Sequence, residues 1–465
     1  MKDTKRKLMP FTFYDRSGIE RLLEEEAAKG WMLEKTSAAG WIYRRIEPAR
    51  IHFAVVYFPG ATAFDPAPSD AQLRFQDFCE HTGWELISSN IQLQIYCNRN
   101  EDPIPIETDP VIELENIHAS VKKTFLPTYV LDLFLGFIQL GLTYQRFSMD
   151  PVGTFANTAE LLSILFWILL IFSCAAQIFM YYRWHHKAKI AAQDGHFLET
   201  RGTDRFQITM IISSSLALIF MLLSYGGSSM ILIGLLMVVS IVGCGFLLTK
   251  VSNFFKKRNT TAKTNRLITY GLAILISLII CGVVLWLMVS SVLSSRDRRD
   301  EAIPYEHNNW TFYVYQDDIP LRIEDLIETN YTGYSYEMLS DKSSPLLSRY
   351  EARQRPRHDA LSEPEIHYHI VKVKAAALYD WVVNLMKAEL SHGIYYPEDG
   401  SYPEQHPVID PAPWGADRVY QLCFGEEAQY RYLICYPGYI VEIDLDWEPT
   451  AEQMQIIAQK LLSHK

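Results

Sequence analysis

The chain has 465 residues, 49% of them hydrophobic, which is enough for two or three ordinary domains and argues against a disordered protein. The net charge of −11 is unevenly spread: residues 1–123 carry −4, residues 124–300 carry +7 and residues 301–465 carry −14. Neither end has a clustered lysine and arginine face, which argues against a nucleic-acid partner.

The first thirty residues contain no apolar run of signal-peptide length, so we expect a cytoplasmic N-terminus. The seven cysteines form no CxxC pair. This spacing argues against a zinc ribbon or a thioredoxin-like redox site.

The N-terminal part contains an internal repeat with an offset of 53 residues. The repeated positions are Gly30, Trp31 and Tyr43 in the first copy and Gly83, Trp84 and Tyr96 in the second. Each copy reads as strand, helix, strand, strand. We therefore expect an α+β domain over residues 1–110 with one antiparallel sheet and two helices, in which the two tryptophans are core residues.

Local signals support the two helices of the repeat. Ser17 with Glu20, and Ser69 with Gln72, have the spacing of capping boxes. Each helix then ends at its glycine, which suits a left-handed C-terminal cap. The apolar runs at 11–14 and 52–58 predict a strand ahead of each helix.

These residues resemble a bacterial membrane-protein family catalogued as domain of unknown function 2812. The matching segments are Lys29-Gly30-Trp31, Tyr43-Arg44-Arg45, Val55-Val56-Tyr57 and Gly83-Trp84-Glu85. The resemblance implies membrane spans followed by a further domain. It also implies a stress-responsive or regulatory setting in Gram-positive bacteria, beside PadR-type transcriptional regulators. The family has no assigned chemistry, so it implies no catalytic residue.

Five apolar stretches approach the ~20 residues that a helix needs to cross a bilayer. They cover residues 125–144, 160–182, 207–224, 229–249 and 267–293. We therefore expect a five-helix transmembrane bundle over 124–295, in contact with the lipid bilayer and preceded by a juxtamembrane linker over 111–123.

The basic residues of the loops predict the orientation, because short cytoplasmic loops hold the lysine and arginine excess. The loops after the second and fourth stretches are basic, whereas those after the first and third are nearly uncharged. This places the N-terminal domain in the cytoplasm and residues 300–465 outside the cell. Arg296, Arg298 and Arg299 disagree, since they follow the fifth stretch on the expected outer side.

Asp132 lies inside the first apolar stretch. An ionisable residue within hydrocarbon is expensive and suggests a proton or ion relay, or a pairing site for another helix. The alternative is that it points into the bundle or toward the headgroups.

Residues 300–465 read as a second α+β domain. Strands are expected at 310–315, 367–373, 418–424, 430–436 and 439–445, and helices at 375–390, with Gly393 beyond, and at 450–464. Thr450 and Gln453 form a third capping box.

Three groups in this domain are candidates for chemistry. His367 and His369 share one strand face, as a metal site requires, but spacing supplies no third ligand, so a half-exposed face is the ordinary interpretation and we expect no metal or other cofactor. Arg353, Arg355 and Arg357 form the one basic patch, which either receives an anionic partner or pairs with nearby acids. A turn between Glu427 and Ala428 would place Tyr432 opposite Cys423, which argues against a Cys423–Cys435 disulfide unless the register differs.

The sequence contains no nucleophile elbow, P-loop, HExxH motif or dinucleotide loop, so we expect no enzyme. The favoured hypothesis is a two-sided membrane sensor or regulatory scaffold, whose cytoplasmic domain binds a regulatory protein or a small ligand. The alternative is a membrane transport component that uses Asp132.

Overall fold

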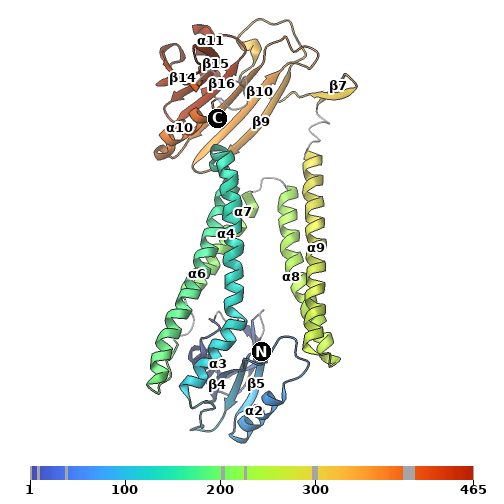
Figure 1. The fold of residues 1–465 in the computed structure, drawn as a ribbon, viewed down its shortest axis with the longest axis vertical. Helices are drawn as coiled ribbons and strands as arrows, with labels where there is room; N and C mark the ends of the chain where they lie inside the picture. Colours follow the sequence, from blue (N-terminus) through green and yellow to red (C-terminus); the bar gives the residue numbers. More distant parts are fainter. Residues whose placement is uncertain are drawn as a thin grey trace. The chain divides into compact units, whose positions relative to one another are not determined.

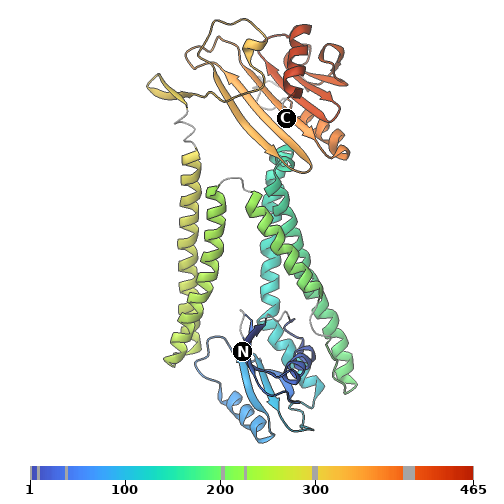
Figure 2. The same cartoon turned by 180° about the vertical axis from the view of Figure 1, so that it is seen from behind.

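A computed structural model describes residues 3–7, 11–36, 40–200, 205–224, 228–295, 302–390 and 404–463. Arg296, Arg298, Arg299 and Gly393 lie outside the described residues. The chain divides into two compact units (Figures 1 and 2). The first unit comprises Met1–Gly141, Ile164–Leu222 and Gly226–Leu285, and the second comprises Leu142–Ser163, Leu223–Tyr225 and Trp286–Lys465.

The N-terminal part of the first unit contains two separate three-stranded antiparallel sheets. Its elements are β1 (Thr4–Lys7), α1 (Arg16–Ala28), β2 (Trp31–Lys35), β3 (Trp41–Arg45), β4 (His52–Tyr57), α2 (Asp70–His81), β5 (Glu85–Asn90), β6 (Leu93–Asn98) and α3 (Pro110–Lys123). The sheets are ordered β1-β3-β2 and β4-β6-β5, so each half has its first strand beside its third. The expectation of one antiparallel sheet is therefore wrong, because the strands of each half pair only with one another.

One strand of this region differs from the sequence prediction, and the expected linker is helical. The first strand is Thr4–Lys7 and not residues 11–14. The segment expected as a linker over 111–123 is helix α3, whose Ile117 and Val121 are buried in the hydrophobic core. Asp109 caps this helix by accepting from the backbone amides of Val111 and Ile112, followed by a proline at the first helical position.

One of the two predicted capping boxes in this region forms, and the other does not. Ser69 and Gln72 do form the expected capping box at the start of α2. At α1 the predicted capping box is wrong: a helix capped by Ser17 would begin at Gly18, but α1 begins two residues earlier, at Arg16, and Ser17 lies within it. Gly30 and Gly83 have φ angles of +83° and +86°, so both take the left-handed conformation predicted for a helix end.

The repeated aromatic residues are mostly core residues. Tyr43 and Tyr96 are fully buried, and Trp84 is buried with its indole nitrogen donating to the carbonyl of Ile104 at 2.8 Å. Trp31 is only half-buried, and the ammonium group of Lys5 lies 4.3 Å from its ring centroid.

All five predicted apolar stretches are helical. They correspond to α4 (Phe125–Met149), α6 (Thr158–Gln193), α7 (Arg205–Ser224), α8 (Ser228–Lys257) and α9 (Ala262–Ser295), with the short α5 (Pro151–Ala156) after α4. Among the described residues, three helical segments are long and apolar enough to cross a membrane: Pro110–Met149, Thr158–Gln193 and Ala262–Leu287. Ile208–Phe220 in α7 is apolar but shorter. The five-helix bundle thus stays a prediction.

The C-terminal part of the second unit is an α+β domain, as predicted. Its strands are β7 (Ile303–His307), β8 (Trp310–Val314), β9 (Ser335–Ser343), β10 (Leu347–Arg355), β11 (Ile366–Val373), β12 (Glu404–Gln405), β13 (Val408–Ile409), β14 (Arg418–Phe424), β15 (Glu427–Tyr436) and β16 (Tyr439–Leu445). Its α-helices are α10 (Tyr379–Glu389) and α11 (Ala451–Ser463), with 3-10 turns at Ile323–Asp325, Ala376–Leu378 and Ala412–Trp414.

Eight strands of this domain form one antiparallel sheet ordered β12-β14-β15-β16-β11-β10-β9, with β13 on β14. One face packs against α11 through a core that includes Trp414, Tyr368 and Ile457. The other face packs against α10 and α5 through Val371, Met386 and Val152. The sheet therefore has a helix layer on each face.

The sequence analysis misses β9 and β10, which carry many charged residues; β10 consists of buried and half-buried residues, and the second half of β9 is mostly exposed. The predicted hairpin register is also wrong. Cys423 lies opposite Ala428, because the turn occupies Gly425 and Glu426. A register shift between Gln421 and Cys423 then places Cys435 opposite Arg418. Both cysteines are free thiols.

Candidate functional site: a cavity beside the N-terminal module

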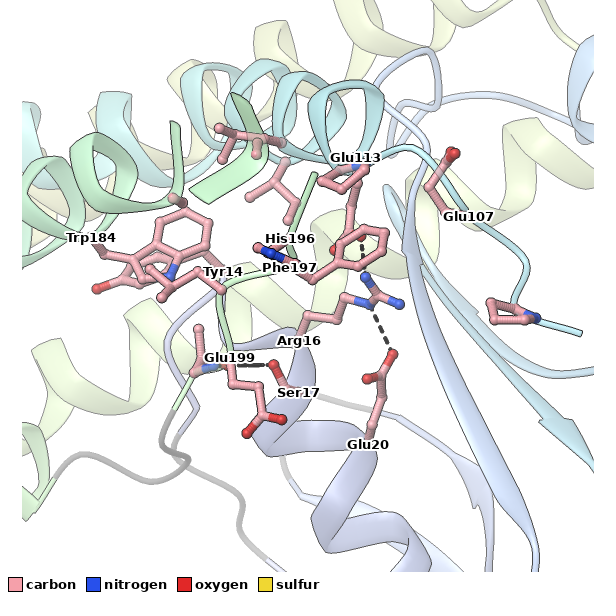
Figure 3. A pocket seen from close by; sticks show the side chains of 18 residues that line it. Tyr14, Arg16, Ser17, Glu20, Glu107, Glu113, Trp184, His196, Phe197 and Glu199 are labelled. Atoms are coloured by element: carbon pink, nitrogen blue, oxygen red, sulfur yellow. Dashed lines mark hydrogen bonds and ion pairs between the residues drawn. The ribbon is translucent and has the colours of Figure 1, made fainter. Parts of the chain in front are cut away.

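A cavity of about 310 Å³ lies in the first unit, between the N-terminal module and the end of α6 (Figure 3). Its module wall comes from α1 and α3, and its other wall comes from the C-terminal turns of α6 and the segment up to Thr200. The charged and aromatic lining residues are Tyr14, Arg16, Glu20, Glu107, Glu113, Trp184, His196, Phe197 and Glu199.

Arg16 lies at the centre of the polar wall, between two carboxylates (Figure 3). Its Nε donates to Oε1 of Glu20 at 2.9 Å, and its Nη1 forms an ion pair with Glu113. The same Glu20 oxygen accepts from the backbone amide of Val55 at 2.8 Å. The cluster therefore joins α1, β4 and α3.

Burial shapes the titration of this cluster. Burial works to lower the pKa of Arg16, but the carboxylates of Glu20 and Glu113 outweigh it and raise that pKa above its ordinary value. Burial raises the pKa of Glu20, and the guanidinium of Arg16 offsets the rise only in part. Arg16 is thus held permanently charged within an acidic surrounding.

The opposite wall is aromatic. Tyr14 and Trp184 stack with ring centroids 4.8 Å apart, and the ring centroid of Phe197 lies 5.4 Å from the guanidinium carbon of Arg16. The indole nitrogen of Trp184 is buried and has no hydrogen-bond partner among the described residues. A bound molecule with an acceptor could satisfy that donor.

The segment after α6 folds back onto α1. Gly195, with φ +78°, ends α6, and the amide of His196 donates to the carbonyl of Ala191 at 2.9 Å, as in a Schellman cap. Thr200 then meets Ser17: its amide donates to the Ser17 hydroxyl oxygen at 3.1 Å. This contact explains why Ser17 is not a helix cap.

The sequence-predicted site residues do not meet at this cavity. Asp132 is half-buried on α4, near Cys174 on α6. The structure shows no role for it. Arg353, Arg355 and Arg357 are paired with acids: the first two with Glu337 at 2.9 and 2.8 Å, and the third with Asp359 at 3.1 Å. The pairing is the second alternative that the sequence left open, and their role as a binding patch stays a prediction.

The cavity residues themselves were missed. Arg16, Glu113 and Thr200 are far apart along the chain and form no local motif. Two features of the sequence point weakly to these residues. Glu113 lies in the acidic start of a helix, just after a proline, and Arg16 and Glu20 are four residues apart on one face of another helix.

A comparison with curated proteins and one with solved structures gave no match. Residues 15–129 match the model of a family described as protein of unknown function (DUF2812), which confirms the resemblance over that segment. The matched segment includes the Arg16 and Glu113 wall of the cavity, and we call the N-terminal module the DUF2812 domain after the family model that it matches.

Proposed function

We propose that the chain is a membrane-bound regulatory protein whose DUF2812 domain binds a small organic cation in the cavity beside α6. One observation carries the proposal: the cavity is walled by the DUF2812 domain and by a helix long and apolar enough to cross a membrane. A ligand bound there contacts α6 directly through Trp184, so occupancy can alter the helix's packing or position.

The lining favours a cation. Four carboxylates, those of Glu20, Glu107, Glu113 and Glu199, line the cavity. Arg16 pairs with Glu20 and Glu113, and Arg21 pairs with Glu199 at 3.1 Å, so the carboxylates outnumber the guanidinium groups by two. The surplus negative charge lies beside the rings of Tyr14, Trp184 and Phe197. Carboxylates and aromatic faces together recognise ammonium groups on apolar bodies. The volume suits a ligand at the small end of the range for drug-sized molecules.

Contacts within each unit support the predicted sidedness. The loop after α6 contacts the DUF2812 domain through Thr200 and Ser17, and Asn265 at the start of α9 donates to the carbonyl of Phe64 at 3.1 Å. These are the two basic loops that charge places in the cytoplasm. In the second unit, the Ser344 hydroxyl donates to the carbonyl of Phe155 at 2.6 Å, which supports placing the C-terminal domain with the nearly uncharged first loop, outside the cell.

Ligand binding tests the proposal on the full chain in detergent. The probe is benzyltrimethylammonium, and the matched ligand is neopentylbenzene, which has the same shape without charge. We expect calorimetry to detect the cation and not its neutral analogue. Glu113→Gln should weaken binding about tenfold or more, because the cavity loses one desolvated charge.

The matched control for that variant is Glu115→Gln, on the exposed side of the same helix. Equal affinity in the two variants would place the cation elsewhere and reject the cavity. A C-terminal tag that protease removes from intact cells would support the outer placement of residues 300–465. Protection, with cleavage after lysis, would contradict it.

The alternative function is a transport component that uses Asp132. It rests on the half-buried carboxyl of Asp132 on α4, inside a helix of membrane-spanning length. It predicts that Asp132→Asn abolishes cation flux into vesicles while leaving cation binding at the cavity intact.

A further inference from the structure

Strand register gathers four ionisable residues on one face of the C-terminal sheet. His369 on β11 lies opposite Glu351 on β10 and opposite Glu442 on β16. His367 is two residues along β11 and therefore projects from the same face. This face is the one that α5 and α10 cover farther along the strands. The cluster lies entirely within the second unit.

Three of these side chains place one ligand atom each at nearly equal distances. The Nε2 atoms of His367 and His369 are each 3.2 Å from Oε1 of Glu351 and are 3.3 Å from one another. All three residues are half-buried. Their side chains are 16–27% exposed, so solvent reaches the group.

Protons cannot satisfy all three contacts. An imidazole Nε2 either carries a hydrogen or offers a lone pair. If both nitrogens donate to the Glu351 oxygen, both hydrogens point at that oxygen, and the 3.3 Å contact between the two nitrogens has no hydrogen bond. If only one donates, the other nitrogen directs a lone pair at the carboxylate. A single cation at the centre is attracted to all three atoms at once.

The triangle has the size of one face of a zinc tetrahedron. Zinc binds histidine nitrogen and carboxylate oxygen at about 2.0–2.2 Å, which separates two ligands of a tetrahedral ion by ~3.3 Å. The triangle edges of 3.2, 3.2 and 3.3 Å agree with that separation. We propose that Glu351, His367 and His369 bind one divalent transition-metal ion, with zinc as the best-fitting ion.

Neighbouring charges orient two of the three ligands. The other carboxylate oxygen of Glu351 accepts from Nη2 of Arg349 at 3.1 Å, and Nη1 of Arg349 donates to Asp150 at 2.8 Å. Oε2 of Glu442 lies 3.6 Å from Nδ1 of His369, while Oε1 of Glu442 accepts from Arg431 at 2.7 Å. A carboxylate behind a metal-binding histidine is a common outer shell of zinc sites.

The fourth coordination position faces a cavity of about 330 Å³. Both histidines line it, together with Asp150, Met386 and Glu389. Three protein ligands and an open position are the arrangement of exchangeable zinc sites, whereas structural zinc sites have four protein ligands. The fourth ligand is therefore water or a small anion that enters from the cavity. The site stands whether or not the cation cavity of the first unit binds its ligand.

Metal binding is measured on the full chain in detergent, with a purification tag free of histidine. After dialysis against a chelator, titration with Zn²⁺ alone should give one ion per chain. His367→Gln combined with His369→Gln should lower the affinity by more than the ~10- to 100-fold that loss of an outer-shell partner causes. His307→Gln, a histidine on β7 in the same domain, is the matched control and should leave the affinity unchanged.

A second variant guards against loss of folding. Glu351→Gln keeps the side-chain shape and an acceptor oxygen, and should lose zinc while its metal-free circular dichroism matches that of the original chain. Co²⁺ loaded in place of zinc should give the intense visible absorption of four-coordinate cobalt, and Glu351→Gln should abolish it. The proposal is overturned if the original chain binds no zinc, or if the double histidine variant binds it as tightly as the control.

Discussion

Replacing Glu337 by glutamine should loosen strands β9 and β10. The carboxylate of Glu337 is 8% exposed and accepts from Arg353 at 2.9 Å, from Arg355 at 2.8 Å and from the Ser335 hydroxyl at 2.9 Å. Glutamine leaves two guanidinium groups without their shared counter-charge. Breaking a buried pair costs about 3–5 kcal/mol. Because the two arginines are 30% and 31% exposed, solvent screens part of this, and we expect about 2–3 kcal/mol.

Hydrogen exchange of backbone amides in β9 and β10 measures this loss locally. A cost of about 2–3 kcal/mol corresponds to exchange that is ~30- to 140-fold faster. Glu328→Gln, an exposed acid in the same domain, is the matched control and should change exchange little. If Glu337→Gln accelerates exchange no more than Glu328→Gln does, the three-residue cluster contributes nothing measurable and the energetic reasoning is wrong.

The same cluster predicts a pH dependence. Burial works to raise the pKa of Glu337, but hydrogen bonds and charge from Arg353 and Arg355 outweigh it, so the pKa lies below its ordinary value. A lowered folded-state pKa stabilises the fold above the unfolded value of about 4.3, and this contribution is lost as pH falls through the folded-state pKa. The stability difference between the original chain and Glu337→Gln should therefore shrink as the pH falls below about 4.3.

Two backbone predictions concern the DUF2812 domain. Ser69→Ala removes the acceptor for the Gln72 amide and should destabilise α2 by about 1 kcal/mol, measured as faster hydrogen exchange in its first turn. Ser17→Ala should leave hydrogen exchange at the start of α1 unchanged and should speed the exchange of the Thr200 amide. Gly83→Ala forces a side chain into a φ of +86° and should cost about 1–2 kcal/mol in thermal unfolding; an unchanged midpoint would contradict the strain.

Strong local signals explain the elements that the sequence predicts well. The structure confirms the capping pair Ser69–Gln72, the glycines at 30 and 83 and the strand Tyr439–Leu445, whose signals each act within a few residues. The apolar helices likewise follow from their composition. The predicted helix at 450–464 begins within one residue of α11, because Thr450 and Gln453 cap its start reciprocally.

Long-range competition explains the failures. The Ser17 hydroxyl accepts from the amide of Thr200, 183 residues away, and the Glu20 carboxylate accepts from the amide of Val55, 35 residues away. Both residues have the capping spacing, but tertiary partners take their polar atoms. Strand β10 was missed because its sequence, LSRYEARQR, carries four charges. Those charges are tolerated on a half-covered face where neighbouring strands supply opposite charges.

Both proposed sites therefore depend on pairings that a search for local motifs cannot find. The spacing of His367 and His369 raises the question of a metal, but the third ligand lies on a strand whose register places Glu351 opposite His369. A shift of β10 by one residue would turn Glu351 to the other face and leave the Nε2 atoms of both histidines without a carboxylate beside them. The lack of enzyme motifs in the sequence thus argues only against sites whose residues lie close together in the sequence. Whether this sheet face can bind an ion depends instead on the strand register.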